Sequence, residues 1–222
     1  FVFLGRAVII LLPFVEEIAK RVNYISVVSS AATVYVAVLF AWDFLSKILS
    51  KDSLREKLSA RIRTISLVCA GLVAGFLLTF SDTFWFSAVE AEVYAYSSFL
   101  TAIVFWLILK WEEKADEAGS DRYLILITYL MGLSIGVHLL NLLTIPAIVL
   151  VYYYRKYEAS IKGTIIALLV SFTILVFVLY GLIPGFISLA GYVELFFVNT
   201  LGLPFNSGAL FYCLLTVGIL VW

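Results

Sequence analysis

The stretch YLILITYLMGLSIGVHLLNLLTIPAIVLVYYY, from Tyr123 to Tyr154, contains no Asp, Glu, Lys or Arg. A helix crosses a ~30 Å hydrocarbon core with about 20 apolar residues, so this stretch is long for one span and short for two. Non-helical backbone at membrane depth occurs where it lines a protein or water-filled cavity. We therefore expect two short helices, 123–137 and 142–154, that turn near Gly136 to Leu143, with Pro146 at the start of the second.

The rest of the chain is equally apolar. It has 222 residues, is 64% apolar and has a mean hydropathy of +1.09, whereas a soluble domain is roughly 45–50% apolar. We predict an all-α integral membrane protein, a polytopic helical bundle with one transmembrane domain over residues 1–222. Because the sequence begins without Met and ends within an apolar run, we expect a fragment truncated at both ends. The remaining spans are expected at 24–45, 65–80, 93–109, 164–183 and 209–222.

The basic residues predict the orientation of these spans. The loop Ser46 to Arg63 carries six basic residues against Asp52 and Glu56, and the positive-inside rule places it in the cytoplasm. With the broken helix pair, 12 of the 15 basic residues lie on that side. Since the 15 acidic residues cancel the 15 basic ones, no net field favours a nucleic-acid partner. The lipid bilayer is the expected surrounding.

The run SDTFWFSAVEAEVYA, from Ser81 to Ala95, then lies on the external side. Acids at a membrane edge are functional candidates, and this run has Asp82, Glu90 and Glu92. On a helix the two glutamates point about 200° apart, so they form no carboxylate pair unless the segment is extended. Glu90 would share its face with Tyr94, an acid beside an aromatic ring that suits sugar hydroxyls. The alternative is that these acids only mark where a helix meets external water.

A second polar group occurs in the broken stretch. Ser134, His138 and Asn141 are spaced as one stripe of a helix, which suits contact with a phosphate or lipid headgroup. The alternative is hydrogen bonding between helices. His138 is the sole histidine, so we expect no metal site, and patterns of phosphate-loop ATPases, serine hydrolases and zincins are missing. A further external loop, Pro184 to Gly208, is expected to carry Glu194, Asn199 and Asn206.

Three strings resemble, in order and spacing, a family of bacterial multi-pass membrane proteins formerly of unknown function: SDTFWFSAVEAEVYA, YLMGLSIGVHLLNLLTIPAIVLVYYY and ELFFVNTLGLPFNSG. That family is related to the animal enzyme that O-mannosylates plexin-type domains. Both resemble the glycosyltransferase C superfamily, whose members take a sugar from a polyprenyl-phosphate carrier on the extracytoplasmic face. The resemblance covers nearly the whole chain.

The resemblance implies a membrane glycosyltransferase that moves a sugar, mannose in the related enzyme, to Ser or Thr hydroxyls of exported proteins. It implies a bacterial inner membrane with the site facing the periplasm, and no cofactor. The segment Gly132 to Asn141 would lie beside the leaving phosphate, with His138 where many relatives carry lysine. The catalytic acid is expected upstream of Phe1, in the first external loop, so we assign no catalytic residue. Substrate binding is expected from Asp82, Glu90, Glu92, Tyr94, His138, Asn141, Glu194, Asn199 and Asn206.

Two other functions fit the same sequence. A transporter or channel would use the broken stretch as a midplane site and would be built from an inverted repeat, which is not visible here. A non-catalytic membrane subunit would use the acids only as boundary charges. Sugar transfer by the full-length protein distinguishes the enzyme from both.

Overall fold

The computed structural model describes residues 2–222, apart from the side chains of Ser53 and Leu220. The described part contains helices and turns and no strand. Four of its helices are long and apolar enough to cross a membrane, which confirms the predicted all-α polytopic class: Ile18–Leu49, Ala60–Thr79, Val93–Lys114 and Ile161–Asn199. The chain divides into two compact units, Phe1–Ala167 and Leu168–Trp222. The single transmembrane domain expected over residues 1–222 stays a prediction.

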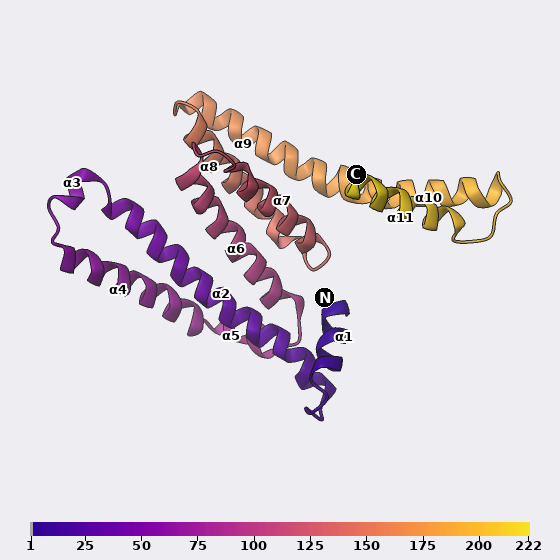
Figure 1. Ribbon diagram of the computed structural model, residues 1–222, viewed down its shortest axis with the longest axis horizontal. Helices are drawn as coiled ribbons and strands as arrows, with labels where there is room; N and C mark the ends of the chain where they lie inside the picture. Colours follow the sequence, from indigo (N-terminus) through magenta and orange to yellow (C-terminus); the bar gives the residue numbers. More distant parts are fainter. Residues whose placement is uncertain (1) are drawn as a thin grey trace. The chain divides into compact units, whose positions relative to one another are not determined.

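The first unit is built around α2 (Ile18–Leu49). As Figure 1 shows, α2 runs beside α4 (Ala60–Thr79) and α6 (Val93–Lys114), and it also contacts two short helices, α1 (Val2–Leu11) and α5 (Asp82–Val89). Small side chains recur at three- and four-residue intervals on its buried face, and they let helices in lipid approach closely. The buried residues of this face are Ser26, Ser29, Ser30, Thr33 and Val36.

The α2–α4 contact depends on two glycines one helical turn apart. A Cβ atom at Gly71 or at Gly75 would lie 3.2 Å from a methyl group of Val38. That spacing is tighter than an ordinary carbon–carbon contact of 3.5–4.0 Å. The close approach of the two helices therefore requires glycine at these two positions of α4.

The stretch Tyr123 to Tyr154 is broken in its middle. Helix α7 (Asp121–Ile135) ends before Gly136, a 3-10 helix η1 (Leu139–Thr144) follows, and α8 (Ile145–Lys156) completes the stretch. The backbone N–H groups of Val137 and His138 both donate to Ser134 O, at 2.9 and 2.8 Å, which closes the end of α7. Pro146 lies in the first turn of α8, where its missing N–H costs no hydrogen bond. The turn falls within the expected Gly136 to Leu143.

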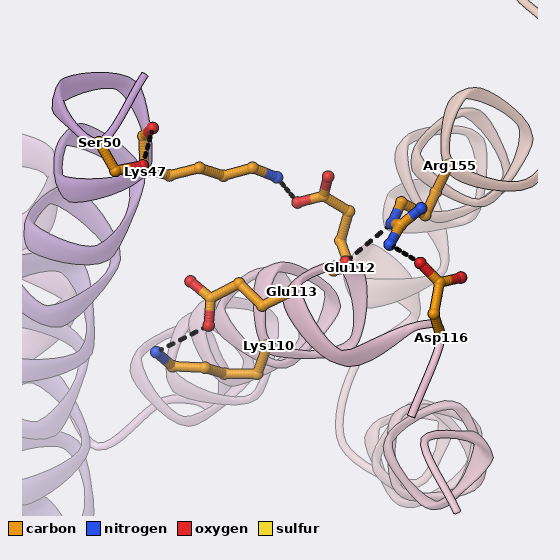
Figure 2. A network of polar contacts seen from close by, with 7 residues as sticks. All are labelled: Lys47, Ser50, Lys110, Glu112, Glu113, Asp116 and Arg155. Atoms are coloured by element: carbon orange, nitrogen blue, oxygen red, sulfur yellow. Dashed lines mark hydrogen bonds and ion pairs between the residues drawn. The ribbon is translucent and has the colours of Figure 1, made fainter. Parts of the chain in front are cut away.

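Ion pairs join the ends of α2, α6 and α8 that carry the basic residues (Figure 2). Lys47 of α2 pairs with Glu112 of α6, and Arg155 of α8 pairs with Asp116. The hydrogen bond from Arg155 lowers the pKa of the exposed Asp116 carboxyl below its usual 3.8. The ion pair of Asp116 with Arg155 therefore contributes its full stabilisation above the ordinary pKa of the carboxyl. That stabilisation is lost as the pH falls through the lowered pKa of the folded protein.

Asp43 is an acid within the expected span 24–45, and it has two partners on α6. Its carboxylate accepts a hydrogen bond from Trp106 Nε1 at 2.8 Å and pairs with Lys110 Nζ at 2.7 Å. Charged groups facing lipid are costly unless they are paired. The two contacts therefore allow an acid near the end of a membrane helix.

The second unit differs from the expected loop after Pro184. Helix α9 (Ile161–Val176) continues through a π-helical segment η2 (Phe177–Leu182) into α10 (Ile183–Asn199), and α11 (Ser207–Val221) packs against α10. The expectation of a loop over 184–208 is wrong for residues 184–199. Pro184 falls in the first turn of α10, where proline is tolerated. The non-helical connection begins after Asn199 and ends before Ser207.

Candidate functional site

The expected helix through Glu90 and Glu92 is interrupted between them. Helix α5 ends at Val89 and α6 begins at Val93. The Glu92 N–H donates to the Glu90 carbonyl at 2.9 Å, which is the hydrogen bond of a three-residue γ-turn. The prediction that the glutamates lie on opposite faces of one helix, with Glu90 on the face of Tyr94, is therefore wrong. Both glutamates are exposed on this turn, which we call the acidic turn (residues 90–92).

Two side chains of α2 hold the acidic turn. Asn23 Nδ2 donates to the Val89 carbonyl at 2.8 Å, and Ser26 Oγ donates to the Glu92 carbonyl at 3.4 Å. The end of a helix leaves carbonyls without intrahelical partners, and Asn23 supplies a donor for that of Val89, the last residue of α5. Neither residue was expected at the site from the sequence. Their sequence signal is polar side chains inside an otherwise apolar span.

Asn23→Leu is expected to loosen the acidic turn. Loss of one hydrogen bond of about 1 kcal/mol raises hydrogen exchange at the backbone amides of residues 90–93 about fivefold. Exchange measured by mass spectrometry on the full chain in lipid nanodiscs checks this. Thr33→Val is the matched control, because its hydroxyl donates only to Ser29 O of the same helix. Equal exchange in the two variants would contradict the role of Asn23.

The structure brings Tyr94 and His138 together. They are 44 positions apart in the sequence, and their ring centroids lie 5.3 Å apart with the planes tilted by 58°. Tyr94 is in the first turn of α6, directly after the acidic turn, and His138 is the residue that precedes η1. The acidic turn, the phenol and the imidazole thus lie at the same end of the first unit.

The imidazole of His138 is oriented by its own backbone. His138 is extended, with φ −160° and ψ 141°, and its Nδ1 accepts a hydrogen bond from the Leu140 N–H at 3.1 Å. An Nδ1 that accepts carries no hydrogen, so this hydrogen-bond network assigns the ring hydrogen to Nε2. Ser134, His138 and Asn141 do not lie on one helical stripe as expected, because α7 ends before His138. Ser134 Oγ instead donates to the His138 carbonyl at 3.3 Å.

Asn141 is fully buried, with 0% of its surface exposed. Neither its Oδ1 nor its Nδ2 has a hydrogen-bond partner in the described part of the chain, and the same holds for Oγ of the fully buried Ser97. Leaving such a group unpaired costs about 1–3 kcal/mol, so native buried amides normally have partners. Asn141 therefore exposes no surface to a phosphate or lipid headgroup in this structure, although such a contact was expected. The residue is instead a buried, unsatisfied amide in η1, three positions after His138.

The remaining predicted site residues have other surroundings. Asp82 is exposed in the first turn of α5, where the helix dipole stabilises a negative charge. Both carboxylate oxygens of Glu194 accept backbone N–H groups at the start of α11, from Asn206 at 2.6 Å and Ala209 at 2.8 Å. Asn206 itself is left-handed, with φ 72°, and Asn199 is exposed at the end of α10. Glu194 is thus occupied by capping.

A metal site was not expected. Within residues 2–222 as described, no group of three or more His, Cys, Asp or Glu side chains is placed to hold a metal ion. The polar groups that the site does offer are hydrogen-bond donors and acceptors, namely the carboxylates of the acidic turn, the Tyr94 hydroxyl and His138 Nε2. Such groups bind hydroxyls and phosphate oxygens.

These features define a polytopic α-helical membrane protein with a cluster of carboxylate, phenol and imidazole groups at one end of its helices. The chain belongs to the family whose model is described as the Protein O-mannosyl-transferase TMEM260 N-terminal domain, which matches residues 1–161. This match confirms the predicted relation to the animal O-mannosyltransferase. No curated protein and no solved structure matches the chain.

Proposed function

We propose that this protein is a membrane glycosyltransferase that moves mannose from a polyprenyl-phosphate carrier to Ser or Thr hydroxyls of exported proteins. The family description names protein O-mannosyl transfer, and the charge pattern favours an extracytoplasmic site. In a bacterium the membrane would be the inner one and the site would face the periplasm. The observation that carries the proposal is the Tyr94–His138 contact, which joins the two polar groups predicted independently from the sequence.

The groups of this cluster suit the two halves of the substrate. The Nε2–H of His138 is a donor without a carboxylate partner among the described residues, and it fits an oxygen of the leaving phosphate. The carboxylates of Glu90 and Glu92 are acceptors that fit the hydroxyls of a sugar or of the acceptor protein. Tyr94 lies between the two groups along the chain and offers a ring face and a hydroxyl.

In the proposed reaction a Ser or Thr oxygen attacks the anomeric carbon of the carried sugar. The new carbon–oxygen bond forms as the bond to the carrier phosphate breaks, with inversion, and the phosphate leaves with the bonding electron pair. His138 stabilises the charge that develops on the phosphate. The hydroxyl proton passes to a base, which the family resemblance predicts in the first external loop of the full-length protein.

Sugar transfer by the full-length protein tests this proposal. The protein is reconstituted in vesicles with polyprenyl-phosphate mannose and a Ser/Thr peptide, and mannosylated peptide is measured by mass spectrometry. We expect transfer to this peptide and none to the same peptide with each Ser and Thr replaced by Ala. Transfer from a sugar nucleotide, with none from the polyprenyl donor, would contradict the proposed donor. No transfer from either donor would contradict the enzyme assignment.

A further inference from the structure

A small cavity lies between α2 and α4. It is near the end of these helices that α3 (Asp52–Arg55) connects, which can be followed in Figure 1. Its volume is about 250 Å³, and polar residues of its lining are Ser46, Ser50, Arg63 and Thr64. Three larger cavities formed by α2 with α4, α5 or α6 have no charged residue in their linings. The cavity at Arg63 is therefore chemically different from these apolar grooves.

Arg63 lacks an acceptor in this cavity. Its Nε atom is buried without a hydrogen-bond partner, and Arg63 takes part in none of the ion pairs of the described residues. The hydroxyls of Ser50 and Thr64 already donate to backbone carbonyls, of Lys47 at 2.8 Å and of Ala60 at 3.1 Å. A buried donor without an acceptor is unfavourable. An acceptor group in the cavity would satisfy Nε.

The surroundings of the cavity favour a negatively charged acceptor. The loop 46–63 has six basic residues and two acids, Asp52 and Glu56, and neither acid pairs with Arg63. Of the six basic residues, Lys47 alone has an ion-pair partner among the described residues, Glu112. The N-terminus of α4, whose first residue Ala60 lines the cavity, adds the positive end of a helix dipole.

We propose that this cavity binds the phosphate group of an anionic phospholipid headgroup. The guanidinium fork of arginine matches phosphate oxygens, and anionic lipids gather at the basic, cytoplasmic ends of membrane helices. Two apolar residues of the lining, Leu49 and Leu67, provide contacts for the apolar part of a lipid. Two residues beyond Arg63, Ile65 of α4 is 51% exposed, as expected for a surface covered by acyl chains.

Lipid retention tests this site without reference to catalysis. The full chain is reconstituted with equal amounts of phosphatidylglycerol and phosphatidylcholine, extracted in mild detergent, and the retained lipids are counted by native mass spectrometry. We expect wild type to retain phosphatidylglycerol preferentially and Arg63→Gln to reduce that preference about tenfold. Lys57→Gln is the matched control, because it removes the same charge from the same loop without altering the cavity lining. Arg63→Lys, which keeps the charge but loses Nε, is expected to retain an intermediate preference.

The outcomes separate the sources of the phosphate. Phosphatidylglycerol that remains bound in excess inorganic phosphate supports the headgroup, whereas its displacement shows that free phosphate fills the site and overturns the lipid assignment. Equal retention by Arg63→Gln and Lys57→Gln overturns the site, because the loop charge alone would then attract the lipid. Circular dichroism of each variant controls for folding, and the Arg63→Lys protein provides a second comparison if Arg63→Gln unfolds.

Discussion

His138→Ala is expected to lower the turnover number of sugar transfer by about a hundredfold. The proposed function gives His138 Nε2 the task of stabilising charge on the leaving phosphate, and donors aimed at developing charge contribute 10²–10³-fold in comparable reactions. Because that charge appears during bond breaking, the loss falls on kcat more than on KM. Steady-state kinetics of the full-length protein with the polyprenyl donor measure both constants.

The orientation of His138 makes this prediction specific. Nδ1 is occupied by the Leu140 N–H, so Nε2 is the nitrogen that remains for a substrate. His138→Lys is expected to recover part of the turnover, because an ammonium group also pairs with a phosphate. Tyr94→Phe keeps the ring that contacts the imidazole and removes only the phenol hydroxyl, so it tests that hydroxyl separately from His138. Turnover near wild type in His138→Ala would exclude a role for His138 in the leaving-group contact.

Gly208→Ala is expected to separate α11 from α10. A Cβ atom at Gly208 would lie 2.6 Å from Glu194 Cα and 2.7 Å from the Val193 carbonyl oxygen. Both are backbone atoms, so no side-chain rotation relieves the overlap. We expect a local destabilisation of about 3 kcal/mol, which exposes the connection between the helices to protease about a hundredfold more often.

Limited proteolysis between Asn199 and Ser207, followed by mass spectrometry, measures this opening. Gly218→Ala is the matched control on the same helix, because nothing lies within 4 Å of its Cβ position and alanine favours the helix. Gly208→Ala also disturbs the two N–H groups that Glu194 caps. Similar cleavage rates in the two variants would mean that α10 and α11 do not pack as closely as the structure shows.

The helical class and the break in Tyr123 to Tyr154 could be predicted from the sequence because both depend on local composition. A run without charges predicts membrane helices, and the balance of basic residues across loops required that this run turn back. The turn was expected near Gly136 to Leu143, with Pro146 at the start of the second helix. Tyr94 and His138 were both recognised as polar groups on the external side, although their contact needed the tertiary structure.

The acidic turn could not be predicted, because its cause is distant in the sequence. The residues Val89 to Val93 include no glycine or proline, and their pattern favours a continuous helix. Asn23 compensates for the interruption by bonding the freed Val89 carbonyl, and Ser26 bonds the Glu92 carbonyl at the other end of the turn. Tertiary contacts thus override local propensity here. A tertiary contact also explains Asp43, because the partners of its carboxylate lie on α6.

The loop predicted from Pro184 onward was wrong for a local reason. Proline followed by Gly185 is a common signal for a turn, yet proline is also accepted in the first turn of a helix. The π-helical segment ends two residues before Pro184, so the regular α-helical pattern is already interrupted there. Pro184 and Gly185, which predict the end of a helix, therefore lie within the continuous helical path of α9, η2 and α10.

The π-helical segment Phe177–Leu182 also sets an angle. A π turn takes one residue more than an α turn, so each residue after it is displaced by about 100° around the axis from its place on an uninterrupted α-helix. The side of α10 that meets α11 is thus not the continuation of the same side of residues 168–176. Deleting one residue from this segment would rotate the α10–α11 hairpin by that angle about the helix axis without altering either helix. The six residues of the π-helical segment thus determine which way the hairpin faces relative to residues 168–176.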